Sequence, residues 1–230
     1  MSMRWLLWKD YRQNRLIVYT ALGLLLAPHL VALYATCRAK LLGFDPGSGW
    51  RYYFQGSSFY SLLISQVAVA LLGGNSIAGE RVDRSAEFLF SLPIARGKLL
   101  ASKVLSAMGL AATIWVTNTL MWHVAVMGPT GPIAPNWPLR EARTDAAITG
   151  LTFFCVAWFI SSLIASPAYA VGAGLVAPLF VLGGIRFFEH LFEFDIGDLT
   201  VQLWWRRICV TLAVPCFVVG TWHYLRRVEP

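Results

Sequence analysis

Residues Leu16–Thr36 read LIVYTALGLLLAPHLVALYAT, a stretch of 21 positions without a charged side chain. A helix needs about 20 mostly apolar residues to cross a hydrocarbon core about 30 Å thick. The stretch is longer than the apolar region of a typical secretory signal peptide, and no clear small-x-small cleavage site follows it. The sequence therefore predicts a membrane-spanning helix at residues 16–36.

Five further apolar runs of similar length follow, at residues 59–78, 104–127, 146–166, 169–187 and 208–225. The runs are continuous rather than alternating, which favours helices over a β-barrel, because a helix pairs its own backbone polar groups in lipid. The chain is 57% hydrophobic and 13% charged, whereas soluble domains have roughly 45–50% apolar and about 25% charged residues. We predict an all-α, polytopic protein with six transmembrane helices in a single transmembrane domain spanning residues 1–230.

The lysines and arginines predict the orientation. With six crossings, 11 of the 19 lie on the side of the two termini and 8 on the other side, and the richer side is normally cytoplasmic. We therefore expect both termini in the cytoplasm and the protein in the cell (inner or plasma) membrane. The net charge of +7 then reflects topology and contact with anionic lipid, and the absence of a run of five like charges argues against nucleic acid as a partner.

The densest charge cluster lies between the second and third apolar runs, in GERVDRSAEFLFSLPIARGKLLASK (Gly79–Lys103), with eight charged residues in 25 positions. At 100° per residue, one helical face carries four charged side chains: Glu80, Asp83, Arg84 and Glu87. The opposite face is apolar, which predicts an amphipathic helix over residues 80–91 that lies under the membrane and offers its charges to a protein. Pro93 prevents this helix from continuing uninterrupted.

Two other segments have an interfacial pattern. In WKDYRQNRL (Trp8–Leu16), Trp8 favours the lipid interface, whereas Lys9, Arg12 and Arg15 are expected near the headgroups. The outer segment 185–205 alternates aromatic and acidic residues around Gly197, and it predicts short helices that lie at the interface or dip into it.

The segment 79–103 resembles the signature E-R-x-x-G-T-x-E-x-L-x-S-x-P-x-x-R…K of ABC exporter permeases, the second type of ABC exporter membrane subunit. The matching positions are Glu80, Arg81, Ser85, Glu87, Leu89, Ser91, Leu92, Pro93, Arg96 and Lys103. In that family the signature also follows the second of six spans, an amphipathic connecting helix precedes the first span, and short re-entrant helices precede the last. Arg84 stands where the family usually has glycine.

The resemblance implies that two membrane subunits pair, as a homodimer or a heterodimer, above two ABC ATP-binding subunits. It implies coupling roles for the cytoplasmic helix after the second span, carried by Glu80, Arg81, Asp83, Arg84, Glu87, Pro93 and Arg96. The chain has no G-x-x-x-x-G-K-[ST] phosphate loop. We therefore expect ATP to bind the partner subunit, and we expect this chain to bind no cofactor directly. The expected protein is thus a non-catalytic export subunit whose substrate the sequence does not identify.

Three polar residues that interrupt the predicted spans, Gln66, Asn118 and His123, are candidates for a translocation path, and His29 beside Pro28 in the first span is a further polar residue of this kind. Such residues either form hydrogen bonds between helices or line a translocation path. The four cysteines and the pattern Glu189-His190-x-x-Glu193 lack the ligand number and spacing of a metal site. An intramembrane enzyme is disfavoured because H-E-x-x-H and G-x-S-x-G are absent, whereas a membrane assembly or immunity protein that moves nothing stays an alternative.

Overall fold

The computed structural model describes residues 3–43, 49–82, 95–127, 137–192 and 197–227. These residues form six helices and no strand: α1 (Met3–Leu41), α2 (Gly49–Val82), α4 (Arg96–Val126), α5 (Trp137–Leu163), α6 (Pro167–Leu191) and α7 (Asp198–Arg227). Each is long and apolar enough to cross a membrane, and each contains the greater part of one predicted span. The all-α prediction and the six transmembrane helices are confirmed.

The helices are longer than the hydrocarbon core requires. At 1.5 Å per residue, the 39 residues of α1 extend over about 58 Å, and the 25 of α6 over about 38 Å. A bilayer is about 40–45 Å thick with its headgroup regions. The helix ends therefore reach the headgroup regions, where charged side chains can be accommodated.

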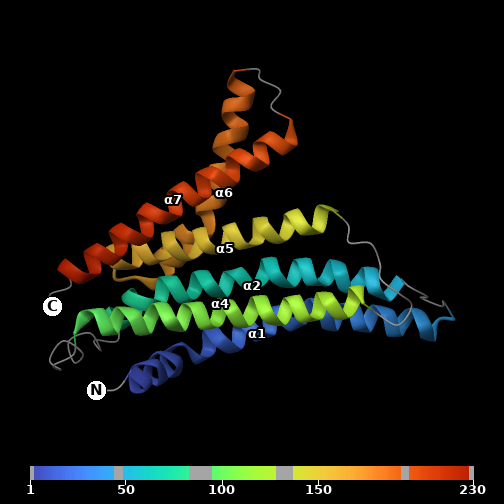
Figure 1. Ribbon diagram of the computed structural model, residues 1–230, viewed down its shortest axis with the longest axis horizontal. Helices are drawn as coiled ribbons and strands as arrows, with labels where there is room; N and C mark the ends of the chain where they lie inside the picture. Colours follow the sequence, from blue (N-terminus) through green and yellow to red (C-terminus); the bar gives the residue numbers. More distant parts are fainter. Residues whose placement is uncertain (1–2, 44–48, 83–94, 128–136, 193–196, 228–230) are drawn as a thin grey trace.

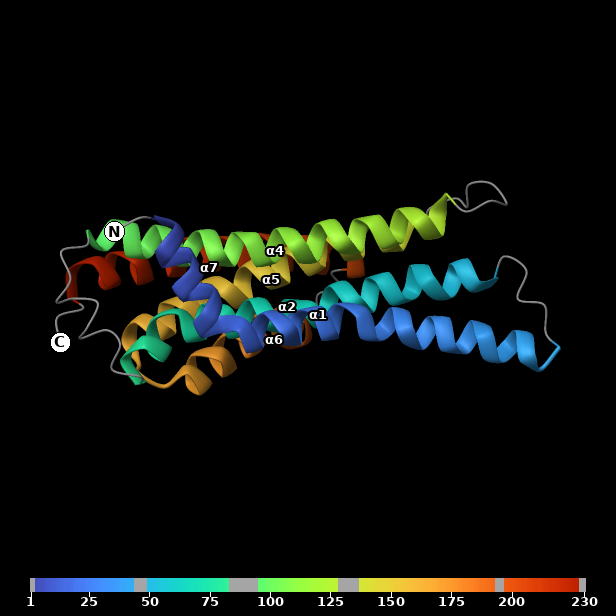
Figure 2. The ribbon, with the colours of Figure 1, turned by 90° about the horizontal axis from the view of Figure 1, so that it is seen from below.

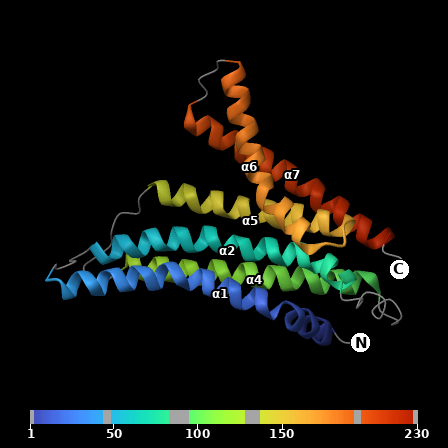
Figure 3. The same cartoon turned by 180° about the vertical axis from the view of Figure 1, so that it is seen from behind.

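The helix α2 occupies the centre of the bundle. It packs against α1, α4, α5 and α6, and α5 also packs against α6 and α7 (Figure 1). Of the 18 residues in the most apolar window of each helix, 72% are buried in α2, compared with 22% in α1 and 17% in α6. Both termini lie at the same end of the bundle, which we call the N/C end; the opposite end is the far end (Figures 1 and 3).

Small residues allow the close packing of α5. A Cβ at Gly73 on α2 would lie 2.8 Å from the carbonyl oxygen of Phe154, and one at Gly174 on α6 would lie 2.7 Å from that of Phe153. Both distances are shorter than van der Waals contact, so α2 and α6 could not approach α5 as closely with any other residue there. Trp158 on α5 is fully buried and lies in one cluster with Ile77 of α2 and Tyr224 of α7.

Two interfacial segments differ from the predicted separate helices. The N-terminal segment is continuous with the first span in α1, but it bends and lies across the N/C end of the bundle (Figure 2). The described parts of segment 185–205 extend α6 and α7, and α6 turns away from the bundle midway (Figure 1). Pro178 within α6 accounts for that turn, because proline removes one hydrogen bond and crowds the preceding turn.

The predicted amphipathic helix over residues 80–91 is described only as far as Val82, where α2 ends. Four of the residues expected to couple to an ATPase lie outside the described residues: Asp83, Arg84, Glu87 and Pro93.

Candidate functional site

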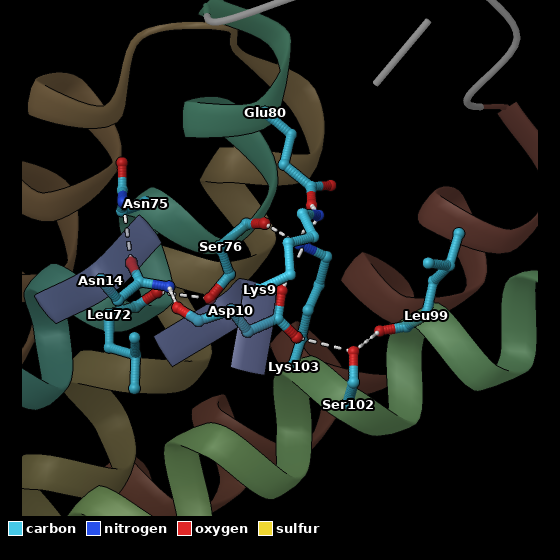
Figure 4. Close-up of polar contacts among 10 residues, drawn as sticks. All are labelled: Lys9, Asp10, Asn14, Leu72, Asn75, Ser76, Glu80, Leu99, Ser102 and Lys103. Carbon is cyan, nitrogen blue, oxygen red and sulfur yellow. Dashed lines mark hydrogen bonds and ion pairs between the residues drawn. The ribbon is translucent and has the colours of Figure 1, made fainter. Parts of the chain in front are cut away.

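A buried charge cluster lies at the N/C end, where the last turn of α2 meets the N-terminal segment of α1 and the start of α4 (Figure 4). Its centre is Glu80, which is 4% exposed. The Glu80 Oε1 atom lies 2.5 Å from the Nζ of Lys9 on α1 and 2.8 Å from the Nζ of Lys103 on α4. One carboxylate thus connects three helices.

A second carboxylate balances the two ammonium groups. Asp10 is 3% exposed, its Oδ1 lies 3.8 Å from the Nζ of Lys9, and Ser102 donates to its Oδ2 at 2.6 Å. Lys103 also donates to the carbonyl oxygen of Ser76 at 2.5 Å. Buried charges are tolerated only when they are paired and hydrogen-bonded, and these contacts meet that condition with equal numbers of cations and anions. We call Lys9, Asp10, Glu80, Ser102 and Lys103 the N/C-end cluster.

Two amides extend the cluster toward the membrane. Asn75 on α2 donates to the side-chain oxygen of Asn14 at 2.8 Å, and Asn14 donates to the carbonyl oxygen of Asp10 at 2.9 Å (Figure 4). Because Leu6, Asp10 and Asn14 recur every fourth residue, they form one buried face of the N-terminal segment. The polar network therefore fixes this segment against α2 at Lys9 and Asn14, which are five positions apart.

The arginines of the signature bind the ends of two other helices. Arg81 donates to the carbonyl oxygen of Ser162 near the end of α5 at 2.9 Å, and Arg96 donates to that of Leu225 near the end of α7 at 3.1 Å. The last carbonyls of a helix lack partners within the helix and carry partial negative charge, so cations are favourable there. The residues on either side of segment 83–94 thus contact α1, α4, α5 and α7.

These contacts change the expected role of Glu80. The sequence predicted that Glu80 would present its charge to another protein, but the structure buries it between two lysines of its own chain. A helical wheel shows which charges share a face but does not show what covers that face. Lys9 differs in the same way, since its ammonium group pairs with Glu80 instead of facing the headgroups.

The other N-terminal residues are exposed, as an interfacial position requires. Trp8 is 55% exposed, and the Arg12 guanidinium lies over its ring at 5.4 Å from the centroid. Arg15 is exposed as well. An aromatic ring with a cation beside it suits the headgroup layer.

Sequence reasoning did not single out Asp10, Asn14, Asn75 or Ser102. Two signals were available: an Asp and an Asn four residues apart in an otherwise aromatic and basic helix, and an Asn near the end of the second predicted span. Neither signal shows that the two segments meet, because that depends on how α1 bends.

The family model for ABC-2 family transporter proteins matches residues 12–191. The chain belongs to this family. No curated protein and no solved structure matches it.

The ABC-2 match begins in the N-terminal segment of α1 and ends at the last residue of α6. It includes both sides of segment 83–94. Together with the six apolar helices, it makes the protein a multi-pass membrane permease subunit of an ABC transporter.

The three polar residues within the ABC-2 spans have different surroundings. Asn118 is 1% exposed and donates to the carbonyl oxygen of Ser58 at 2.6 Å, which joins α4 to α2. His123 is exposed on α4, with its ring against Trp122. Gln66 lines a cavity of about 500 Å³. Asn118 therefore has a packing contact between helices, whereas Gln66 is buried at the border of a cavity.

A second charge cluster joins α5 to α7 toward the far end. Arg206 lies 2.5 Å from Oε2 of Glu141 and 2.6 Å from Oδ1 of Asp145, and Gln202 also donates to Asp145. We call Glu141, Asp145, Gln202 and Arg206 the far-end cluster. The described residues contain no group of three or more His, Cys, Asp or Glu side chains that could hold a metal ion.

Proposed function

We propose that this ABC-2 permease subunit couples ATP hydrolysis by a separate ATP-binding subunit to the export of a substrate across the cell membrane. In this proposal, two membrane subunits form the permease, and the N/C end faces the cytoplasm. The excess of lysine and arginine on that side supports the orientation. The ATP-binding subunit docks on segment 83–94, with Asp83, Arg84 and Glu87 as the contacting charges.

One observation carries the proposal: the residues on both sides of the docking segment connect to four of the other helices. Glu80 pairs with α1 and α4, Arg81 binds the end of α5, and Arg96 binds the end of α7. A displacement of segment 83–94 by the closing ATPase would pull on all of these contacts at once. Glu80, Arg81 and Arg96 then act as positioning residues that transmit the motion, rather than as groups that touch the partner.

The charges of the segment, Asp83, Arg84 and Glu87, suit a docking role. Charged residues at a rim determine register and specificity more than affinity. In the coupled complex, Asp83, Arg84 and Glu87 would fix which ATPase binds and in which orientation. The membrane-embedded helices would form the path along which the substrate crosses the membrane.

The experiment is co-expression of the chain with an ATP-binding cassette protein, sought among the neighbouring reading frames, followed by purification through a tag on the permease. We expect co-purification and an ATPase activity that vanishes when the permease is omitted. The double variant Asp83→Lys/Glu87→Lys should lose the ATPase but still insert into the membrane. The control is Arg186→Ala/Glu189→Ala in the hairpin of α6 and α7, which should retain it. Purification of the permease without any ATPase under these conditions would contradict the proposal and favour a membrane protein that transports nothing.

A further inference from the structure

An apolar cavity opens on the side of the bundle between α4 and α7. Its volume is about 500 Å³, within the range of about 300–1,000 Å³ that small-molecule sites occupy. Met108, Val214 and Val218 line its mouth and are 57–62% exposed. Buried residues of α2 and α5 form its floor, and the two outer helices form its sides. We take this side of the bundle to face lipid, because the residues at its mouth are apolar and exposed, and molecules would then reach the cavity from the bilayer.

One amide breaks the apolar lining. Gln66 on α2 is 2% exposed and borders the cavity. Its Nε2 donates to the carbonyl oxygen of Leu62 at 3.0 Å. A carbonyl oxygen can only accept, so this contact identifies the nitrogen and leaves Oε1 as the other atom of the amide. Within the part of the chain that the structure describes, Oε1 accepts no hydrogen bond.

Gly150 on α5 provides the space for this oxygen. A Cβ at position 150 would lie 1.9 Å from Oε1 of Gln66, so any residue other than glycine would displace the amide. The cavity wall thus accommodates an acceptor whose desolvation costs about 1–3 kcal/mol when it stays unpaired. A ligand with a hydrogen-bond donor would remove that cost.

The depth of Gln66 decides which ligands can supply the donor. Gln66 lies seven positions from the outer limit of the predicted span 59–78 and 12 from the inner limit, or about 10 Å and about 18 Å along the helix. Phospholipid headgroups stay outside the hydrocarbon core, and their acyl chains carry no N–H or O–H. A phospholipid can therefore fill the volume but cannot bond the amide.

We propose that this cavity binds a lipophilic molecule that dissolves in the hydrocarbon core and carries a hydroxyl or N–H group, which donates to Oε1 of Gln66. The lining along α4 runs from Val104 to Trp115, about 16 Å of helix, which sets the length of the apolar body. The inference does not depend on coupling to an ATPase.

Photolabelling of the full-length protein in phosphatidylcholine–phosphatidylglycerol liposomes tests this proposal. The probes are a medium-chain secondary alcohol that carries a diazirine and its methyl ether, which keeps the oxygen but has a methyl group in place of the hydroxyl hydrogen and therefore no donor. We expect the alcohol to label peptides of α4 and α7 about fivefold more than the ether, the factor that a net hydrogen bond of about 1 kcal/mol gives. Equal labelling by the two probes in the unaltered protein would overturn the assignment of Gln66.

Two kinds of variant separate the donor contact from the volume. Gln66→Leu should lower alcohol labelling to the level of the ether, and Gly150→Ala, which displaces the amide without removing it, should do the same. Ala111→Phe should fill the cavity and abolish labelling by both probes, whereas Val116→Phe, on the same helix but outside the cavity, should leave it unchanged. Labelling that survives in Ala111→Phe, or spreads equally over all lipid-facing helices, would show that phospholipid chains alone fill the groove.

Discussion

The charged side chains at the two ends of the bundle differ in how deeply they are buried. In the N/C-end cluster, the side chains of Glu80, Asp10 and Lys103 are each 5% exposed, and the cluster connects three helices. In the far-end cluster, the side chains of Arg206, Asp145 and Glu141 are 16%, 25% and 30% exposed, and the cluster connects α5 and α7. Beyond it, Arg186 at 48% pairs with Asp198 at 92%. Lys9 at 19% and Arg206 at 16% are similar, so the contrast lies in the carboxylates, which are 5% exposed in the N/C-end cluster and 25–30% exposed in the far-end cluster.

This contrast indicates where the bundle depends on its charges. Removing one partner of a buried pair leaves an uncompensated charge and costs about 3–5 kcal/mol, while an exposed pair contributes about 0–1 kcal/mol. The N/C end is therefore held by contacts that fail if one member is lost, whereas the far end tolerates change. Such a difference suits a protein whose input of force is at the N/C end.

The largest effect is expected for Glu80→Ala. Lys9 and Lys103 would then share a buried space with only Asp10 to balance them, so we expect a loss of about 3–5 kcal/mol, or roughly 6–20 °C in the melting temperature. Tryptophan fluorescence of the purified protein in detergent would measure it. The double variant Glu80→Gln/Lys103→Met removes one charge of each sign and should recover at least half of the loss. A melting temperature for Glu80→Ala within about 2 °C of the original would show that the cluster is hydrated.

A smaller loss is expected for Ser102→Ala, because it removes one hydrogen bond to the buried carboxylate of Asp10. Hydrogen bonds to charged groups contribute about 1.5–3 kcal/mol. The same thermal assay applies. Ser106→Ala, one turn along α4, is the matched control, since Ser106 makes no side-chain hydrogen bond among the described residues, and it should change the melting temperature little. Equal effects of the two substitutions would argue against the contact with Asp10.

At the far end, Arg206→Ala should cost only about 1 kcal/mol, because water reaches both carboxylates that lose their partner. The control is Arg207→Ala, whose guanidinium lies over the ring of Trp204 at 5.9 Å and makes none of the contacts of the far-end cluster. A loss for Arg206→Ala as large as that for Glu80→Ala would contradict the contrast between the two ends.

The smallest effect is expected for Arg186→Ala, in the hairpin of α6 and α7. Its side chain is 48% exposed and pairs with Glu189 and Asp198. The Debye length falls from about 10 Å at 0.1 M salt to about 3 Å at 1 M, so concentrated salt weakens these contacts. We expect no measurable change in melting temperature at high salt. A change that persists there would show that the hairpin is buried by another molecule, such as the second membrane subunit.

The six helices could be predicted from sequence because a run such as 16–36 lacks charge, and lipid leaves the backbone few alternatives to a helix. The position of the charge-dense segment after the second span could also be predicted. The burial of Glu80 could not, since its partners Lys9 and Lys103 lie 71 and 23 positions away, and only the bend of α1 brings Lys9 close. The extension of α6 and α7 was missed because alternating aromatic and acidic residues are also typical of short interfacial helices.

The cavity beside Gln66 could not be predicted from the sequence either. An amide side chain within a span indicates either a hydrogen bond between helices or a translocation path. In the sequence, Asn118 and Gln66 cannot be distinguished in this respect. What separates them is the neighbour across the helix interface: the Ser58 carbonyl for Asn118 and the bare backbone of Gly150 for Gln66.

The central claim is that the ATP-binding subunit docks at segment 83–94, between the residues of α2 and α4 that form the contacts at the N/C end. A photo-crosslinking amino acid at position 87, in the complex with the co-expressed ATP-binding subunit, tests it most directly, with position 199 at the start of α7 as the reference. We predict a crosslink to the ATP-binding subunit from position 87 and none from position 199. A crosslink from position 199, or none from position 87 in a complex that hydrolyses ATP, would contradict the claim.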